Sequence, residues 1–365
     1  MFPAIAIAQA IREKIPEARM LFVGAAGRME MEKVPAAGFP IEGLDIAGFD
    51  RRELRKNLAL PYKLAGSLLK ARSVLRKFRP DVVIGVGGYA SWPTLRMASR
   101  MRIPCLIQEQ NSVPGMTNRL LARRVQMICV AYDGMEAFFP KKKILLTGNP
   151  VRKNILMLPA RSAEVYRHFN LDPEKQTVLI LGGSGGAQSV NEAVFSWIHN
   201  RIPSNIQLLW QTGNRYYQYY RSRLPGPAAA DPTVPSSGFT VFPFIDQMDL
   251  AYTCADIIVS RSGAIAISEF CLVGKPVILV PSPNVAGDHQ WENARALASR
   301  EAALIVSDPE VSGKLPETVV GLLGDPVRRE QYGKNIRKLG IPDSADRIAD
   351  QAIGLSLINK QKDGA

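Results

Sequence analysis

Three glycine-rich corners constrain this chain more than any other feature, because each stands where a buried strand is expected to turn into a helix. The corners are Gly-Gly-Tyr-Ala-Ser at 87–91, Gly-Gly-Ser-Gly-Gly-Ala at 182–187 and Arg-Ser-Gly-Ala at 261–264. Each directly follows a run rich in valine and isoleucine. Glycine lets an anionic group approach backbone amides, and a helix N-terminus favours an anion by roughly 0.3–1 kcal/mol. The corners therefore predict a protein that binds phosphorylated ligands.

Strand-like apolar segments alternate with helical patterns along the whole chain, which predicts an α/β fold of parallel sheets with helices on both faces. A Gly-Asn-Pro turn at 148–150 closes the first series. We therefore place one domain at 1–152 and a second at 163–340, and we expect a helix near 343–358 to pack back on the first. The expected strands are 20–23, 82–86, 105–108, 127–131, 144–147, 178–181, 207–211, 240–242, 257–260 and 277–280.

Composition excludes several classes of protein. The 365 residues, 46% of them hydrophobic, suffice for two cores, yet the longest apolar runs are far shorter than the roughly 20 residues of a membrane span. The four cysteines are widely spaced without a Cys-x-x-Cys pattern, as expected of reduced thiols in a cytoplasmic protein. The chain contains no Asp-x-Asp, so we expect no metal site, and we expect no cofactor.

The net charge of +13 is concentrated in a basic segment at 51–79, which has ten Lys or Arg residues and one acid, interleaved with leucines. Such a segment can lie on an anionic membrane surface. The alternative is a solvated helix pair whose leucines face the core. Nucleic acid is not expected as a partner, because the interleaved residues are leucines instead of stacking aromatics. The candidate membrane contacts are Arg51, Arg52, Leu54, Arg55, Lys56, Leu58 and Lys63.

Taken together, the motifs resemble those of a known family. The motifs are 87–91, Gln-Glu-Gln-Asn-Ser-Val-Pro-Gly at 108–115, Gly-Asn-Pro-Val-Arg at 148–152, 182–188, Pro-Phe-Ile-Asp at 243–246, 261–269, and Asp-His-Gln at 288–290 with Asn293. In this order they resemble the UDP-N-acetylglucosamine:N-acetylmuramyl-(pentapeptide) pyrophosphoryl-undecaprenol N-acetylglucosaminyltransferases, which convert lipid I to lipid II in peptidoglycan synthesis. The resemblance extends over essentially the whole chain.

The resemblance implies the GT-B architecture of two Rossmann-like, doubly wound domains facing a cleft, with the UDP-sugar held mainly by the second domain. The reaction would be inverting transfer of N-acetylglucosamine to the C4 hydroxyl of the muramyl sugar. Ser184 would bond the donor diphosphate, and Arg152 would reach it from the hinge. Glu269 would accept both ribose hydroxyls, and Ile245 would meet uracil through its backbone.

The resemblance also implies contacts to sugar hydroxyls from the neutral amides of Asn111 and Gln290. The acceptor would be lipid I, and the enzyme would work as a peripheral protein on the cytoplasmic face of the bacterial inner membrane. His289 stands beside Gln290, but relatives carry other residues at this position, so we do not assign it as a base. The secondary candidates are Gly87, Gly88, Tyr89, Gly183, Gly185, Gly186, Ala264 and Asn293.

One family motif is missing from this sequence. The family's first glycine loop, with its histidine, is expected immediately upstream of Phe2-Pro3-Ala4, so we expect the chain to be short at its N-terminus. We therefore assign no catalytic base within it, and the chain as written is expected to lack that part of the active site.

Other functions stay open at this point. An NAD(P)-dependent oxidoreductase is disfavoured, because the 183–188 segment lacks the third glycine of the dinucleotide fingerprint. Another UDP-sugar enzyme of the same fold, such as a lipid glucosyltransferase or a 2-epimerase, would share the second domain, although the 108–115 motif argues against both. A non-catalytic protein that binds UDP-sugar and membrane is the third alternative, because the first glycine loop is absent.

Overall fold

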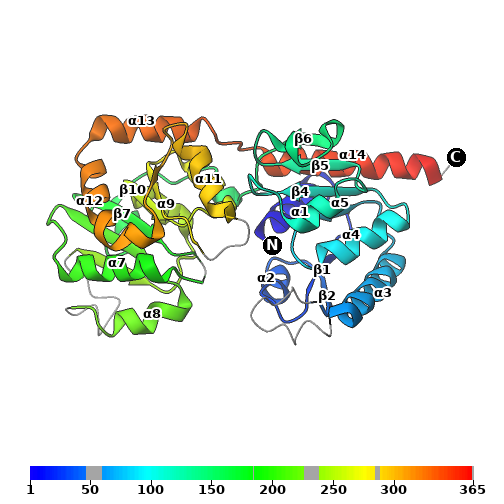
Figure 1. Cartoon of the computed structure of the whole chain (residues 1–365), viewed down its shortest axis with the longest axis horizontal. Helices are drawn as coiled ribbons and strands as arrows, with labels where there is room; N and C mark the ends of the chain where they lie inside the picture. Colours follow the sequence, from blue (N-terminus) through cyan, green and yellow to red (C-terminus); the bar gives the residue numbers. More distant parts are fainter. Residues whose placement is uncertain (47–59, 184, 226–237, 284–287, 364–365) are drawn as a thin grey trace. The chain divides into compact units, whose positions relative to one another are not determined.

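The computed structural model describes residues 1–46, 60–183, 185–225, 238–283 and 288–363 (Figure 1). The chain divides into two compact units. Unit 1 comprises Met1–Val151 and Asp343–Ala365, and unit 2 comprises Arg152–Pro342. All the strand pairs in the described ranges are parallel, which confirms the α/β prediction. Within these ranges no helix combines the length and the apolar character that crossing a bilayer requires.

Unit 2 is built on a six-stranded sheet with the strand order β12-β11-β10-β7-β8-β9. The strands are β7 (Gln176–Leu181), β8 (Ile206–Gln211), β9 (Phe239–Phe242), β10 (Ile257–Ser260), β11 (Val277–Leu279) and β12 (Leu304–Ile305). The chain proceeds from β7 towards one edge and from β10 towards the other, so the direction of winding reverses between these two neighbours. Ligands of open α/β sheets bind outside the carboxyl ends of the strands at such a reversal.

Helices cover both faces of this sheet, because successive strand residues point to opposite sides. Val178 and Ile180 pack with residues of α7, α8 and α12, whereas Leu179 and Leu181 pack with residues of α6, α9, α10, α11 and α13. The helices are α6 (Ala163–His168), α7 (Gln188–His199), α8 (Asn214–Arg221), α9 (Met248–Cys254), α10 (Ala264–Val273), α11 (His289–Ala298), α12 (Val311–Leu323) and α13 (Pro326–Arg337), with short turns at η4 (Lys153–Ile155) and η7 (Asp308–Glu310). Burial on both faces explains why these strands are continuous apolar runs in the sequence.

Unit 1 contains two parallel sheets. β1 (Phe22–Ala25) pairs with β2 (Ile41–Leu44), and a four-stranded sheet follows the order β3 (Val83–Gly85), β4 (Cys105–Glu109), β5 (Met127–Val130) and β6 (Ile144–Leu146). The helices are α1 (Phe2–Lys14), α2 (Glu30–Ala36), α3 (Leu60–Phe78), α4 (Ser91–Arg100), α5 (Met116–Leu121) and α14 (Ser344–Asp363), with short turns at η2 (Met135–Ala137) and η3 (Lys141–Lys143).

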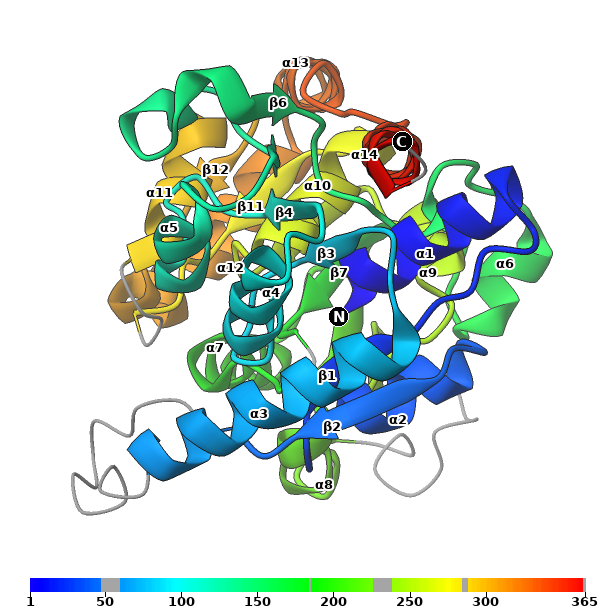
Figure 2. The same cartoon turned by 90° about the vertical axis from the view of Figure 1, so that its right-hand side faces the viewer.

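Helices from the two ends of the chain cover one face of the four-stranded sheet. Ile7 of α1 and Ile348 of α14 share an apolar cluster with Leu106 of β4. The Lys14 ammonium lies 2.9 Å from a carboxylate oxygen of Asp350 and ties α1 to α14. The opposite face is covered by α3 and α4, which lie side by side (Figure 2). Unit 1 is therefore completed by a helix that follows unit 2 in the sequence.

Each expected strand overlaps a strand of the structure, but two short strands were missed. β2 includes Glu42 and Gly43, two residue types that are depleted in strands. β12 has only two residues and pairs with β11 alone. The first segment is not apolar enough, and the second is too short, to be recognised from its own sequence.

Candidate active site

Two of the glycine corners meet at the reversal point of the unit 2 sheet. The 182–187 corner follows β7 and precedes α7, and the 261–263 corner follows β10 and precedes α10. Because β7 and β10 are hydrogen-bonded neighbours in parallel register, their carboxyl ends place the two corners side by side. Ala264, the first residue of α10, is buried at this edge. Two helix N-termini therefore point at the place where a ligand of this sheet type binds.

Two glycines of the 182–187 corner have a backbone conformation that only glycine adopts easily. Gly183 and Gly186 have φ values of +75° and +78°. A Cβ on Gly186 would also lie 2.6 Å from the Tyr216 ring, whereas a Cβ on Gly185 would meet no described atom within 4 Å. The corner thus packs tightly on one side and leaves room on the other for a phosphate to approach. Ser184, the candidate diphosphate ligand, lies outside the described residues.

Glu269 is a buried residue at the centre of a polar trio. Its side chain is 8% exposed, and its carboxylate accepts a hydrogen bond of 3.2 Å from Arg152 Nε and one of 2.8 Å from the Tyr252 hydroxyl. Burial, followed by the nearby Glu269 charge, raises the pKa of Tyr252 well above its usual value. The phenol therefore stays protonated and donates to the carboxylate, which is fixed in orientation on the inner side of α10.

Arg261 joins three segments at the same edge, a role that the sequence did not reveal. Its guanidinium donates to the Val280 carbonyl at 3.0 Å and to the Ser189 hydroxyl at 2.9 Å, and it forms an ion pair with Asp308. Ser189 in turn donates to the same carboxylate at 2.6 Å. The end of β11 and the first turn of α7 are thus held against the third corner.

Gln290 and Asn293 hold the third corner from α11. The Gln290 side-chain oxygen accepts from the Ser282 amide at 2.9 Å, and its backbone carbonyl accepts from the Ser262 hydroxyl at 2.7 Å. Asn293 is completely buried and donates to the Ser262 carbonyl at 3.3 Å. In the part of the chain that the structure describes, Gln290 Nε2 has no hydrogen-bond partner, so this group can donate to a ligand.

Ile245 is buried, and its backbone amide already has a partner. The amide donates to Gln211 Oε1 at 2.9 Å, while Gln211 Nε2 donates to the Gly183 carbonyl at 3.2 Å. Gln211, the last residue of β8, therefore connects the Ile245 segment to the 182–187 corner. A base that used the Ile245 amide would have to displace the Gln211 oxygen.

In unit 1, the first glycine corner precedes α4. Gly87 and Gly88 have φ values of +82° and +83°, and neither would carry a Cβ into contact with a described atom. The Ser91 hydroxyl donates to the Gly87 carbonyl at 2.5 Å and fixes the start of the helix. Tyr89 is 53% exposed. This corner has two left-handed glycines, as the corner of unit 2 does, but neither of them packs against a neighbouring side chain.

Asn111 is positioned by a buried carboxylate. Glu109 is 2% exposed, and one of its oxygens accepts from the Asn111 amide at 3.0 Å and from the Asn111 side chain at 3.3 Å. The other oxygen accepts from the Gly115 amide at 3.0 Å and from the Asn118 side chain at 2.9 Å. A fifth bond comes from the Gln110 amide at 2.9 Å. One carboxylate thus organises the entire 109–115 loop, and the sequence interpretation did not identify it.

Two further amides attach this loop to its neighbours. Gln110 Nε2 donates to the Val86 carbonyl at 2.9 Å, directly before the first glycine corner. Gln108 Nε2 donates to Asn149 Oδ1 at 2.7 Å, in the turn that ends the first series of strands. Three of the predicted motifs of unit 1 are therefore one hydrogen-bonded assembly.

Of the candidate membrane contacts, only Lys63 lies within the described residues; Arg51, Arg52, Leu54, Arg55, Lys56 and Leu58 lie outside them. Lys63 pairs with Asp45 at 3.1 Å. The helix that carries it also exposes apolar side chains, with Tyr62 83% exposed and Leu69 68% exposed. In the described ranges, no three His, Cys, Asp or Glu side chains lie close enough together to hold a metal ion.

Comparison with known proteins identifies the family of this chain. Residues 1–130 match the glycosyltransferase family 28 N-terminal domain, and residues 177–348 match the glycosyltransferase family 28 C-terminal domain. The UDP-N-acetylglucosamine–N-acetylmuramyl-(pentapeptide) pyrophosphoryl-undecaprenol N-acetylglucosamine transferase of Bacteroides fragilis is 50% identical over 98% of this chain and 92% of its own length. The chain belongs to this transferase family.

Other members give the same result. The transferase of Phocaeicola vulgatus is 49% identical over 100% of this chain and 95% of its own length. The crystal structure of Acinetobacter baumannii MurG has a TM-score of 0.72 at 25% identity and covers 97% of this chain and 95% of the other. As a member of the transferase family, the chain is a glycosyltransferase with the GT-B architecture of two Rossmann-like domains. The resemblance found in the sequence motifs is confirmed.

Proposed function

We propose that this protein transfers N-acetylglucosamine from UDP-N-acetylglucosamine to the muramyl C4 hydroxyl of undecaprenyl-pyrophosphoryl-MurNAc-pentapeptide. The acceptor is lipid I and the product is lipid II, a precursor of peptidoglycan. The observation that carries this proposal is the end-to-end match, at 49–50% identity, to transferases named for this reaction. The glycine corners at the reversal point of unit 2 support it, because a nucleotide diphosphate needs such an anion-binding edge.

We assign the donor site to unit 2. The 182–187 corner and the N-terminus of α7 would hold the diphosphate, together with Ser184. The Glu269 carboxylate would accept the ribose hydroxyls. It has about four acceptor positions, and Tyr252 and Arg152 leave at least one of them free on this carboxylate. Arg152 contacts Glu269 in the structure, so we propose that it orients the carboxylate and reaches the diphosphate only when that ion pair opens.

The remaining donor contacts are proposed for backbone and amide groups. Ile245 would meet uracil through its backbone, and the amide could serve only if uracil replaced Gln211 Oε1. Gln290 Nε2 would donate to a hydroxyl of the sugar. Asn293 would act on the donor site indirectly, because it is buried and bonded to the third corner.

We assign the acceptor to unit 1. The loop held by Glu109 presents Asn111, whose amide would bond a sugar hydroxyl, and the first glycine corner with Tyr89 adjoins it. The exposed apolar and basic residues of α3 would rest on the anionic surface in which the acceptor's polyprenyl chain is embedded. The protein would thus act peripherally, on the cytoplasmic face of the inner membrane.

The chemistry is a single displacement at the anomeric carbon. The acceptor C4 oxygen forms the new bond to the anomeric carbon, the bond from that carbon to the UDP oxygen breaks, and the proton of the C4 hydroxyl leaves. The partial positive charge at the glycine corner and the N-terminus of α7 would stabilise the departing diphosphate, where negative charge develops. No described residue is assigned as the base that takes the proton.

The test measures two quantities in one set of variants. Radiolabelled N-acetylglucosamine should move from UDP to a lipid I analogue, and UDP-N-acetylglucosamine should bind with a measurable dissociation constant. Glu269→Gln should weaken that binding about tenfold or more, because a ribose hydroxyl loses its charged acceptor. Glu317→Gln, a change at an exposed residue of α12, is the matched control. The proposed donor site would be overturned if the wild-type protein bound another UDP-sugar more tightly than UDP-N-acetylglucosamine. It would also be overturned if Glu269→Gln left the UDP-N-acetylglucosamine dissociation constant unchanged.

A further inference from the structure

Unit 2 contains a cavity of about 330 Å³, open to the surface, at the edge of the sheet opposite the candidate active site. Its lining includes Asp256 and Pro276, the residues that directly precede β10 and β11. These are the amino ends of the strands, whereas the glycine corners follow the carboxyl ends. The cavity is therefore separate from the proposed donor site.

Helix α13 forms one wall of the cavity and approaches the α10–β11 connection closely. A Cβ on Gly333 would lie 2.9 Å from the Gly274 carbonyl oxygen, and a Cβ on Gly274 would lie 2.9 Å from Arg337 Cδ. Residues 329, 333 and 337 are spaced four apart and so share one face of the helix. Arg329 and Arg337 consequently flank the close contact, and both line the cavity.

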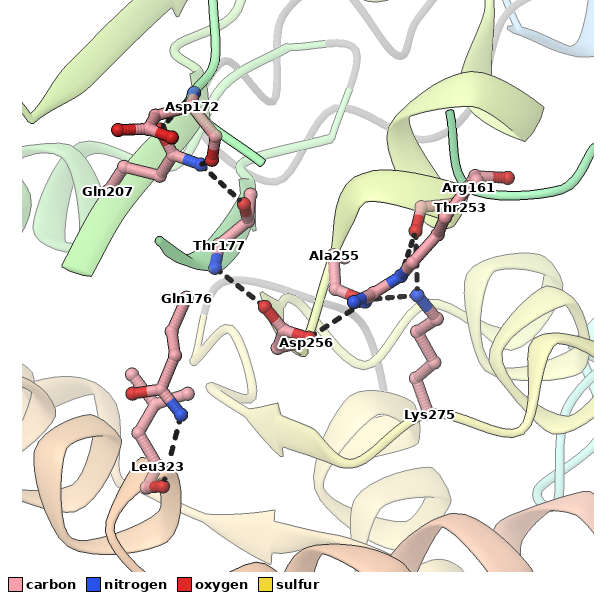
Figure 3. Close-up of polar contacts among 10 residues, drawn as sticks. All are labelled: Arg161, Asp172, Gln176, Thr177, Gln207, Thr253, Ala255, Asp256, Lys275 and Leu323. Atoms are coloured by element: carbon pink, nitrogen blue, oxygen red, sulfur yellow. Dashed lines mark hydrogen bonds and ion pairs between the residues drawn. The ribbon is translucent and has the colours of Figure 1, made fainter. Parts of the chain in front are cut away.

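The acidic groups of the cavity are already neutralised. One oxygen of Asp256 accepts from Arg161 Nη2 at 2.7 Å, and the other accepts from the Thr177 amide at 2.8 Å (Figure 3). Glu330 pairs with Lys334 at 2.5 Å. The acids that line the cavity are thus occupied by their own partners.

The two arginines have no such compensation. Arg329 Nε is buried and bonds to no atom of the described chain. Arg337 is exposed, and its guanidinium has neither a hydrogen bond nor an ion pair within the described ranges. Lys275, next to Pro276, adds positive charge nearby, although its ammonium is bonded to the Thr253 and Ala255 carbonyls (Figure 3). The cavity therefore holds two guanidinium groups that pair with no carboxylate of the described chain.

We propose that this cavity is a binding site for a small ligand bearing an oxyanion, held by Arg329 and Arg337. A guanidinium presents a rigid fork of donors that matches the oxygens of a phosphate or a carboxylate. A buried donor without an acceptor destabilises the folded state, and a bound oxyanion removes that penalty. Occupancy would fix α13 against the α10–β11 connection, and α10 carries Glu269 at the other edge of the sheet. The site is thus placed to influence donor binding from a distance.

The test uses inorganic phosphate and citrate as probes on the full chain. Saturating UDP is present throughout, so that phosphate does not report on the glycine corners. Binding is followed as the rise in Tm with probe concentration at constant ionic strength, and as heat by calorimetry. The wild-type protein should show saturable binding of at least one probe, and the Arg329→Gln/Arg337→Gln double variant should bind it about tenfold more weakly or not at all.

The control is Arg328→Gln, which makes the same type of substitution on the same helix and removes one positive charge where the double variant removes two. Arg328 is exposed and stacks over Tyr332 instead of lining the cavity. Phosphate binding and citrate binding both support the oxyanion site, and their ratio tells which class of oxyanion it prefers. No saturable binding by the wild type, equal binding by the double variant, or an equal loss in Arg328→Gln would overturn the proposal. UDP affinity in the same variants is a separate readout of the donor site.

Discussion

Replacing Glu109 by glutamine should destabilise the 109–115 loop and lower transfer to the acceptor without changing donor binding. The buried carboxylate accepts five hydrogen bonds, three on one oxygen and two on the other. A glutamine amide nitrogen in place of either oxygen turns an acceptor into a donor. The glutamine nitrogen does less damage where it replaces the oxygen that faces the Gly115 and Asn118 donors, so at least these two hydrogen bonds are lost.

The magnitude follows from those two bonds. A hydrogen bond to a charged group contributes roughly 1.5–3 kcal/mol, so the loss is about 3–6 kcal/mol of local stability. Hydrogen exchange read by mass spectrometry should show this loss in peptides of β4 and the 109–115 loop, and not in those of unit 2. Because two units need not unfold together, a peptide-level measurement is preferred to a single unfolding curve.

The functional consequence has its own measurement. Since Glu109 orients Asn111 and lies in unit 1, transfer to a lipid I analogue should fall while the UDP-N-acetylglucosamine dissociation constant stays unchanged. Glu136→Gln, an exposed change in the same unit, is the control and should leave both values unaltered. The reasoning would be refuted if the 109–115 loop of Glu109→Gln exchanged hydrogen at the wild-type rate. It would also be refuted if Glu136→Gln lost as much loop stability and transfer activity as Glu109→Gln.

Three further predictions address the corner, the surface and the thiols. Gly186→Ala should destabilise unit 2 by about 2 kcal/mol or more, because alanine is strained at φ +78° and its Cβ would collide with the Tyr216 ring. The control Gly185→Ala should leave the Tm unchanged, and equal Tm values for the two variants would contradict this packing. The double change Tyr62→Ser/Leu69→Ser should weaken binding to vesicles of anionic lipid by about tenfold, and Val327→Ser, an exposed change in unit 2, should not; sedimentation with vesicles measures both. Burial raises the pKa of three thiols from 9.0 to about 12 and that of the fourth to about 11. Native protein should therefore react with a disulfide reagent at pH 8 far more slowly than unfolded protein, and fast labelling of native protein would exclude this. The stability that these protonated thiols contribute should be complete below about pH 9 and should be lost as the pH rises towards 12. The thiols are Cys105, Cys129 and Cys271 at about 12 and Cys254 at about 11.

Much of the fold could be predicted because its signals are local. The apolar runs at 178–181 and 257–260 form β7 and β10, since a strand buried on both faces must be continuously apolar. The glycines at 183 and 186 adopt the left-handed backbone that the corner requires. The helix expected near 343–358 is α14, which packs on α1. Each of these features depends on residue type and spacing within one short segment.

The candidate site was only partly predictable. The motif containing Glu269 was recognised, but its partner Arg152 lies 117 positions away, and the sequence alone assigned that arginine to the diphosphate. Ile245 was expected to offer its backbone, and the structure shows that Gln211, from another strand, already binds its amide. Glu109 and Arg261 stood inside recognised motifs without being identified as the residues that hold them together.

The sequence by itself determined the class of fold, the family and the places where the backbone must turn, because periodicity, apolar runs and glycine act over a few residues. Only the tertiary structure decided which polar groups are satisfied and which are not. Asp256 and Arg329 are separated by more than one helix in the sequence, yet they line one cavity because α13 lies across the amino ends of the strands. Side-chain pairing of this kind depends on how close distant segments come, and that distance is set by the packing of whole elements.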